Sequence, residues 1–385
     1  MKILTRPLII LVVLLLLVGC DNPLGPAPTS TAQTTFWPTE AWQSSTPEQQ
    51  GLDSAQLAQM FVRIKDQGLN LHSLLVIRNG FIVVEAYFNP YGQSIKHELY
   101  SVTKSFTSAL VGIAIDKGII DGVDHPVQDF FPGQTFANTD QRKSALKLRH
   151  LLTMTSGLDW QEGDPIYQQM YWSNDWVQFV LDTPMAVEPG SRFVYCSGCS
   201  HVLSAIVHKA TGMNTLEFAR TNLFGPLGIS DVAWETDSNR IPIGGWGLKI
   251  MPRDMAKLGY LYLNGGIWDG KQVISISWVK ASVQKLVETD SELGYGYQWW
   301  VYPRFGAYTA LGRYGQTIFV IPESNLVIVT TAAIQDHQPI FDLIEDYIVP
   351  AVRSPGPLPE NPKSQAELNA LITALGERCG EGHAR

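Results

Sequence analysis

The segments with the strongest β-propensity lie near the two ends of this chain, and this distribution constrains the fold more than any other feature. Residues 72–78 and 81–88 flank Asn79-Gly80, a pair that favours a tight hairpin turn. Towards the other end, residues 316–321 and 326–332 are joined by a predicted turn. Because hairpins imply antiparallel pairing, we predict an α/β fold of the α+β type, in which both chain ends form one antiparallel sheet flanked by helices.

Helical patterns fill the chain between these strands. Helices are expected from about Asp53, from about Ser101, and over residues 200–210, 251–263 and 340–348, because apolar residues recur there with helical spacing. The region from about 120 to 240 is the most helical, so we predict that it forms an inserted subdomain. The folded domain is predicted to span residues 46–352.

The two ends of the chain differ from this domain in composition and in their predicted roles. In residues 1–20, Lys2 and Arg6 precede an apolar run that ends in Leu-Val-Gly-Cys20, which resembles a bacterial lipoprotein signal. We therefore expect an exported protein that is anchored in the cell envelope by a lipid on Cys20, or a secreted protein if Cys20 is not lipidated. Residues 21–45 are predicted to be a flexible linker, and residues 353–385 a polar C-terminal tail.

Charge and motif content exclude several functions. With 28 Lys and Arg against 36 Asp and Glu, the net charge is −8, which disfavours nucleic acid as a partner. The chain has no H-E-x-x-H, no G-x-S-x-G, no P-loop and no dinucleotide-binding fingerprint. We therefore predict no metal site and no cofactor.

Four Ser-x-x-Lys pairs remain as candidates for nucleophilic catalysis, because a serine and a lysine three residues apart share one face of a helix. The lysine must be uncharged to act as a base, so its surroundings must lower its pKa. Ser101 and Lys104 fit best because they begin a strongly apolar helix. The other pairs lie in charged or mixed segments: Ser144/Lys147, Ser277/Lys280 and Ser282/Lys285.

A second candidate motif is Tyr195-Cys196-Ser197, which follows Pro189-Gly190 and precedes a helix. A tyrosine near the lysine can relay protons, although Tyr195 could instead be a buried structural residue. Cys196 and Cys199 form a C-x-x-C in a protein expected in an oxidising compartment. A structural disulfide is our main hypothesis, and a redox-active pair or two free thiols are the alternatives.

Several segments, taken in order, resemble the serine β-lactamase and penicillin-binding protein superfamily. The similarity is greatest to the class C-like group that includes esterases, D-amino-acid peptidases and 6-aminohexanoate-dimer hydrolases. The matching segments are residues 100–105, 148–158, 189–197, 244–248 and 253–256. The chain departs from the usual pattern at Met154, where a histidine is common, and at Ser197, where many relatives have asparagine. The resemblance implies a β-lactamase/transpeptidase-like fold.

The resemblance also assigns roles to individual residues. Ser101 would be the acylated nucleophile, Lys104 its base, and Tyr195 a partner in proton transfer. The backbone N–H groups of Ser101 and Arg313 would form the oxyanion hole. Substrate-binding positions would be Ser197 and Gly312. Apart from the resemblance, we expect Tyr171 and Trp172 to bind substrate, because they lie in a loop that would shape the cleft.

The third motif of the superfamily is altered here, since Ala310 stands where a cation usually helps to hold a β-lactam carboxylate. The Arg313 side chain could replace that cation or be a surface charge. The altered motif resembles amide and ester hydrolases more than true β-lactamases. We therefore expect an exported serine hydrolase that cleaves a small amide, ester or peptide through an acyl-enzyme. The alternatives are a β-lactamase, a D-alanyl-D-alanine carboxypeptidase, and an inactive lipid-anchored ligand-binding protein.

Overall fold

The computed structural model of this protein describes residues 36–163 and 165–377. The predicted signal peptide, the proposed lipidation site Cys20 and the first part of the predicted linker lie outside these residues. Within the described part of the chain, no helix is both long enough and apolar enough to cross a membrane.

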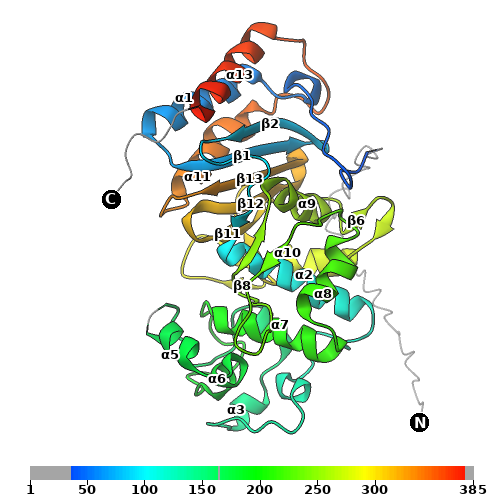
Figure 1. Cartoon of the computed structure of the whole chain (residues 1–385), viewed down its shortest axis with the longest axis vertical. Helices are drawn as coiled ribbons and strands as arrows, with labels where there is room; N and C mark the ends of the chain where they lie inside the picture. Colours follow the sequence, from blue (N-terminus) through cyan, green and yellow to red (C-terminus); the bar gives the residue numbers. More distant parts are fainter. Residues whose placement is uncertain (1–35, 164, 378–385) are drawn as a thin grey trace, which may run out of the picture. The chain divides into compact units, whose positions relative to one another are not determined.

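The largest sheet has eight antiparallel strands in the order β2-β1-β13-β12-β11-β10-β9-β8 (Figure 1). The two predicted hairpins are present, and β1 pairs with β13, so both ends of the chain contribute to one sheet as predicted. The strands of this sheet are β1 Leu71–Arg78, β2 Phe81–Tyr87, β8 Val287–Glu288, β9 Gly294–Tyr295, β10 Trp300–Val301, β11 Tyr308–Gly312, β12 Gln316–Ile321 and β13 Leu326–Ala332. Smaller sheets contain β3 His97–Glu98, β4 Ala233–Trp234 and β5 Leu248–Ile250, and β6 Ile267–Trp268 with β7 Lys271–Gln272.

Both faces of the large sheet are buried, and alternate residues of a strand enter different apolar clusters. In β1, Leu74 and Val76 belong to the cluster that includes α1 and α13, whereas Leu75 and Ile77 belong to the cluster on the opposite face. This alternation follows from the two-residue period of a strand. It explains why the strands read as nearly continuous apolar runs in the sequence.

Helices cover the two faces and form the inserted region. The bounds are α1 Ser54–Gln67, α2 Thr103–Asp116, α3 Gln141–Ser144, α4 Leu148–Leu152, α5 Ile166–Trp172, α6 Trp176–Asp182, α7 Ser197–Thr211, α8 Thr215–Ala219, α9 Pro252–Leu263, α10 Ile276–Val283, α11 Gln338–Leu343, α12 Val349–Ala351 and α13 Pro362–Gly376. Helix α1 packs on α13, and α9 packs on β12 and β13. Helices α3 to α8 all lie within the predicted insertion between about 120 and 240.

The predicted linker is too long at its C-terminal end. Trp37 packs against Tyr260 and Trp268, with ring centroids 5.6 and 5.5 Å away. The buried Trp42 donates from its indole Nε1 to the backbone carbonyl of Arg253 at 3.0 Å. The Pro, Ser and Thr content of this segment hid these two tryptophans, whose large apolar surfaces favour burial.

The prediction of a polar tail after residue 352 is also corrected. Residues Pro362–Gly376 form α13, which packs against α1 and is capped by the Asn361 side chain. Leu368 and Leu375 are buried, two helical turns apart on one face. A narrow apolar stripe of this kind is easily missed in a segment whose composition is mainly polar.

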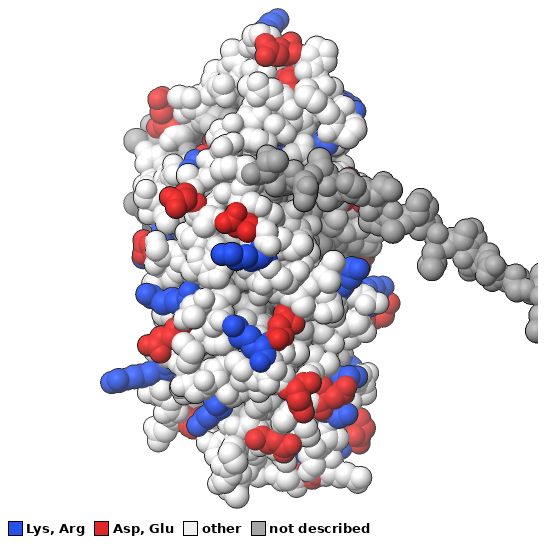
Figure 2. All heavy atoms as spheres, turned by 90° about the vertical axis from the view of Figure 1, so that its right-hand side faces the viewer, with Lys and Arg blue, Asp and Glu red and all other residues white. Residues whose placement is uncertain are grey.

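Charges of both signs are interspersed on the face shown in Figure 2, where Lys and Arg side chains lie among Asp and Glu side chains. Elsewhere among the described residues, opposite charges also pair, as in Lys249 with Glu235 at 2.7 Å. The described part of this face therefore carries no extended surface of a single sign.

Candidate active site

Ser101 and Lys104 lie where the chain enters α2. Residues Tyr100–Val102 form a 3₁₀ turn that leads directly into the helix. Lys104 is buried, and its Nζ lies 2.9 Å from Ser101 Oγ. Burial lowers the pKa of Lys104 to about 8, against the opposing charge of Glu162. This amine therefore loses its proton closer to neutral pH than an ordinary lysine does, as a base requires.

The other three Ser-x-x-Lys pairs have different surroundings. Their serine hydroxyls bond to other groups: Ser144 to the carbonyl of Asp140, Ser277 to the hydroxyl of Ser275, and Ser282 to the carbonyl of Trp278. Lys147 and Lys285 form ion pairs with Asp124 and Glu288 instead. The local apolar context that favoured Ser101 in the sequence thus coincides with the pair that is in contact.

The start of α7 and the residues just before it bring two more groups to Lys104 from almost a hundred residues away. Ser197, the first residue of α7, places its Oγ 2.9 Å from Lys104 Nζ. The Tyr195 ring lies next to the same amine, with Nζ 4.8 Å from the ring centroid. Burial raises the pKa of Tyr195 above its ordinary value, while a hydrogen bond with Ser101 opposes the shift. Tyr195 therefore holds its proton as a neutral phenol, and Trp300 stacks on its ring at 5.8 Å.

Gly245 is a third neighbour of Lys104, since its carbonyl oxygen accepts from Nζ at 2.8 Å. The backbone can come this close because the segment has no side chains there. A Cβ on Gly244 would lie 2.1 Å from the carbonyl oxygen of Ser200, and one on Gly245 would lie 2.9 Å from that of Ser197. The glycine pair was visible in the sequence, but its use as a lysine acceptor was not.

Glu162 is a member of the site that the sequence did not indicate. Its carboxylate accepts from the backbone N–H of Ser197 at 3.0 Å and from the Trp160 indole at 2.8 Å. It also accepts from the hydroxyls of Ser197 and Tyr167. A single glutamate in a polar loop gives no sequence signal of this kind, because the contact depends on how the loop before α5 folds over the start of α7.

Gly312 ends β11 beside the nucleophile turn. A Cβ at this position would lie 2.3 Å from the carbonyl oxygen of Leu99, so only glycine allows the strand to approach so closely. Arg313 follows directly, which brings its backbone near Ser101. The Arg313 guanidinium lies against the Tyr314 ring, 4.9 Å from its centroid.

The two aromatic residues predicted to bind substrate differ in their surroundings. Tyr171 is half exposed and packs against Trp176 and Trp246, with centroids 4.8 and 6.2 Å away. Since Trp246 follows Gly245, Tyr171 belongs to the aromatic wall beside the site. Trp172 is 81% exposed.

A cavity of about 350 Å³ is lined in part by Tyr100, the residue before Ser101. Two histidines in its lining, His72 and His97, each have a ring nitrogen without a hydrogen-bond partner among the described residues. Burial lowers the pKa of His72 to about 4 and also lowers that of His97, so both rings are neutral. Glu98 is the charged group in the lining, whose remaining members are Tyr91, Tyr314, Gln316, Ala332, Ala333 and Gln335.

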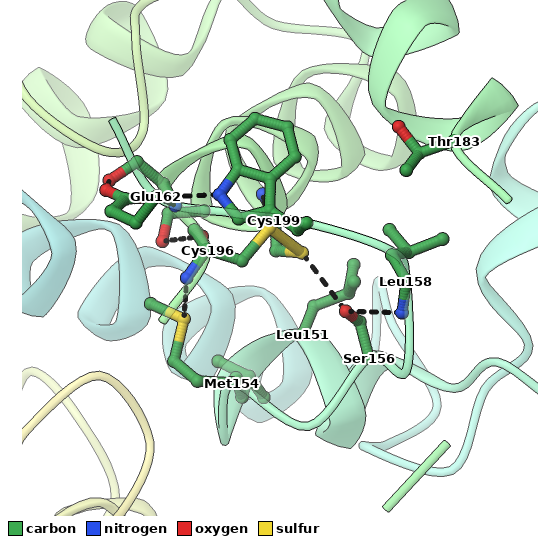
Figure 3. Close-up of a disulfide and its surroundings, with 12 residues drawn as sticks. Leu151, Met154, Ser156, Leu158, Glu162, Thr183, Cys196 and Cys199 are labelled. Atoms are coloured by element: carbon green, nitrogen blue, oxygen red, sulfur yellow. Dashed lines mark hydrogen bonds between the residues drawn. A yellow bond between two sulfur atoms is a disulfide. The ribbon is translucent and has the colours of Figure 1, made fainter. Parts of the chain in front are cut away.

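A disulfide joins Cys196 and Cys199 at the start of α7 (Figure 3). Cys196 Sγ accepts from the backbone N–H of Cys199 at 3.0 Å, so a sulfur atom caps the helix. The backbone N–H of Cys196 donates to Met154 Sδ at 3.3 Å. Among the described residues, no group of three or more His, Cys, Asp or Glu side chains could hold a metal ion.

Removing this disulfide is expected to lower stability. In the chain-entropy treatment a four-residue loop contributes about 2 kcal/mol, and loss of a helix cap costs about 1 kcal/mol more. Cys196→Ala/Cys199→Ala should therefore reduce the free energy of unfolding by about 3 kcal/mol in guanidinium titrations. Cys196→Ser/Cys199→Ala is the matched variant, because the serine oxygen can still cap α7, and it should lose about 1 kcal/mol less. Equal stability of the wild type and both variants would contradict this assignment.

Comparisons with known proteins identify similar sequences. A sequence profile described as Beta-lactamase matches residues 57–349. The 6-aminohexanoate-dimer hydrolase of Paenarthrobacter ureafaciens is 27% identical over 292 residues, covering 69% of this chain and 73% of that protein.

Solved structures show the same fold. A structure described as a putative 6-aminohexanoate-dimer hydrolase from Bacillus anthracis has a TM-score of 0.68 at 22% identity, covering 81% of this chain and 87% of that chain. EstCE1, described as a hydrolase with promiscuous acyltransferase activity, has a TM-score of 0.64 at 18% identity, covering 76% and 99% of the two chains. Since the matching profile spans well over half of the sequence and includes Ser101, Lys104, Tyr195 and Gly312, this chain belongs to the Beta-lactamase family, whose members share a serine hydrolase fold.

Proposed function

We propose that this protein hydrolyses an amide or ester bond through an acyl-enzyme on Ser101. The observation that carries this proposal is the 2.9 Å contact between Ser101 Oγ and the buried Nζ of Lys104, whose pKa is lowered to about 8. A serine hydroxyl is a weak nucleophile unless a neighbouring base accepts its proton. Lys104 is positioned to be that base.

In acylation, the neutral Lys104 amine takes the Ser101 proton while Oγ forms a bond to the substrate carbonyl carbon. The carbonyl π electrons move to oxygen, where the backbone N–H groups of Ser101 and Arg313 would stabilise the negative charge. The bond to the leaving group then breaks. Its nitrogen or oxygen receives the proton of Tyr195, which Lys104 replaces from its ammonium.

In deacylation, a water molecule attacks the acyl carbon and loses its proton to Lys104, directly or through Tyr195. The second tetrahedral intermediate collapses, the bond to Ser101 Oγ breaks, and Oγ recovers a proton. The raised pKa of Tyr195 suits this role, because a phenol that keeps its proton can deliver it when a strongly basic leaving group departs.

One observation favours simple amides and esters over β-lactams. The position that usually carries a carboxylate-binding cation is the buried Ala310. An alanine there cannot pair with a substrate carboxylate, which favours substrates that carry no carboxylate near the scissile bond.

The test is intact-mass spectrometry and turnover with a panel of p-nitrophenyl esters, short amides and nitrocefin. We expect one acyl group per protein on Ser101 with a slowly deacylating ester or a fluorophosphonate. Turnover of short-chain p-nitrophenyl esters should exceed that of nitrocefin in kcat/KM. Faster turnover of nitrocefin would favour a β-lactamase, and a folded protein without any label would overturn the proposal.

A further inference from the structure

Two hydrogen bonds connect Glu162 to Lys104 through the Ser197 hydroxyl, which lies between them. Ser197 Oγ is within hydrogen-bond distance of both Glu162 Oε1 and Lys104 Nζ, the latter at 2.9 Å. We propose that Glu162 is a positioning residue that, by accepting the Ser197 hydroxyl proton, directs the lone pair of the neutral Lys104 amine towards Ser101. This inference rests on the proposed base role of Lys104.

The donors around Glu162 determine the direction of its bond to Ser197. Glu162 Oε2 faces the backbone N–H of Ser197 and the indole N–H of Trp160, at 3.0 and 2.8 Å. Glu162 Oε1 faces the hydroxyls of Ser197 and Tyr167. Because a carboxylate can only accept, both hydroxyls must donate to it. Ser197 has one proton, so towards Lys104 it presents only lone pairs.

The partners of Lys104 then determine where its lone pair points. A neutral amine has two protons and one lone pair. The carbonyl oxygen of Gly245, at 2.8 Å, can only accept, and Ser197 Oγ, at 2.9 Å, is left as an acceptor by Glu162. These two contacts use both amine protons. The lone pair is left for the third neighbour, Ser101 Oγ at 2.9 Å, which is the arrangement that removes the Ser101 proton.

Glutamine at position 162 would reverse the direction of the hydrogen bond between this side chain and Ser197. The amide oxygen must occupy the Oε2 position, since the two N–H groups there cannot become acceptors. The amide NH₂ group would then face Ser197 Oγ and donate to it. The Ser197 proton would be free to turn towards Lys104 and compete with Ser101 for the amine lone pair.

The charge of Glu162 supplies a second, separable readout. The titratable groups beside Lys104 are Glu162, which raises its pKa, and Tyr195, which burial keeps neutral. Removing the Glu162 charge should therefore lower the pKa of Lys104 further. A residue that only supported the fold would reduce activity without moving this pKa.

The experiment compares wild type, Glu162→Gln, Ser197→Ala and the double variant, with pH profiles of kcat/KM for a p-nitrophenyl ester. Glu162→Gln should lower the high-pH plateau of kcat/KM about ten- to a hundredfold. It should also move the acid limb of the kcat/KM profile to lower pH, because the pKa of Lys104 falls. Since Glu162 directs Lys104 through Ser197, the double variant should have the plateau of Ser197→Ala. Glu188→Gln is the matched control, because it removes the same charge from an exposed position and should move neither quantity.

Two outcomes would overturn the inference: multiplicative plateau losses in the double variant, or an unshifted acid limb in Glu162→Gln. NMR titration of labelled lysine in the wild type and Glu162→Gln measures the Lys104 pKa without any turnover. An unchanged pKa would refute the electrostatic coupling even if no substrate is cleaved. Failure of the proposed function is recognised separately, as the absence of acylation of wild-type Ser101.

Discussion

Ser101→Ala is expected to lower kcat for ester hydrolysis by at least about 10⁴-fold and to abolish the acyl-enzyme mass. The variant lacks the atom that forms the covalent bond, and Lys104 Nζ, 2.9 Å away in the wild type, has no hydroxyl to deprotonate. Little else should change, since the alanine is smaller and retains the backbone N–H proposed for the oxyanion hole. Substrate affinity, measured by equilibrium binding, should stay within a few-fold of the wild type.

The control is Ser277→Ala, which alters an exposed Ser-x-x-Lys serine on α10. It should retain wild-type kcat and the acyl-enzyme mass. If Ser101→Ala still forms a covalent adduct with the same ester, a different nucleophile operates. If the wild type binds ligand without turnover and Ser101→Ala binds it equally, the chain is an inactive binding protein.

Lys104→Met is expected to lower kcat/KM by about 10³-fold, the middle of the range for loss of a general base. Methionine retains most of the buried volume of the side chain but cannot accept a proton. It also leaves the Gly245 carbonyl without its contact from Lys104. Circular dichroism and thermal unfolding should show that the variant is folded, so that the loss can be attributed to chemistry.

The pH dependence of kcat/KM provides a further test of Lys104 as the base. Because the pKa of Lys104 is lowered to about 8, the wild-type kcat/KM should rise as pH increases through about 8, where the amine loses its proton. Lys104→Met should lose this limb and give a residual rate without it. Lys280→Met, at another Ser-x-x-Lys motif, should retain both the rate and the limb. If the wild-type limb were centred near pH 10 or above, the pKa of the Lys104 amine would not be lowered, and this result would contradict its role as base.

Much of the fold could be predicted because it depends on local signals. The Asn79-Gly80 turn and the start of α1 next to Asp53 both appear in the structure where the sequence placed them. The errors lie at the edges of the domain. Trp42 and Leu368 are buried by partners distant in the chain, so segments that are mainly polar in composition became part of the folded body.

The candidate site also combines residues brought together locally with residues brought together by long-range contacts. Ser101 and Lys104 are three residues apart, and helical geometry alone brings them onto one face. Ser197, Glu162 and Gly245 reach Lys104 through long-range contacts, and two of these three were not assigned a role from the sequence.

What the sequence determined by itself was therefore the set of short-range elements, the nucleophile motif with its apolar helix, and the family in which such motifs recur. These follow from propensities, turn chemistry and spacing, which act over a few residues. Only the tertiary structure showed how closely Lys104 is surrounded by Ser197, Tyr195 and Gly245, and which acceptors occupy the protons of its amine. Desolvation and hydrogen-bond direction depend on every group within a few ångströms, and folding brings those groups together from distant parts of the chain.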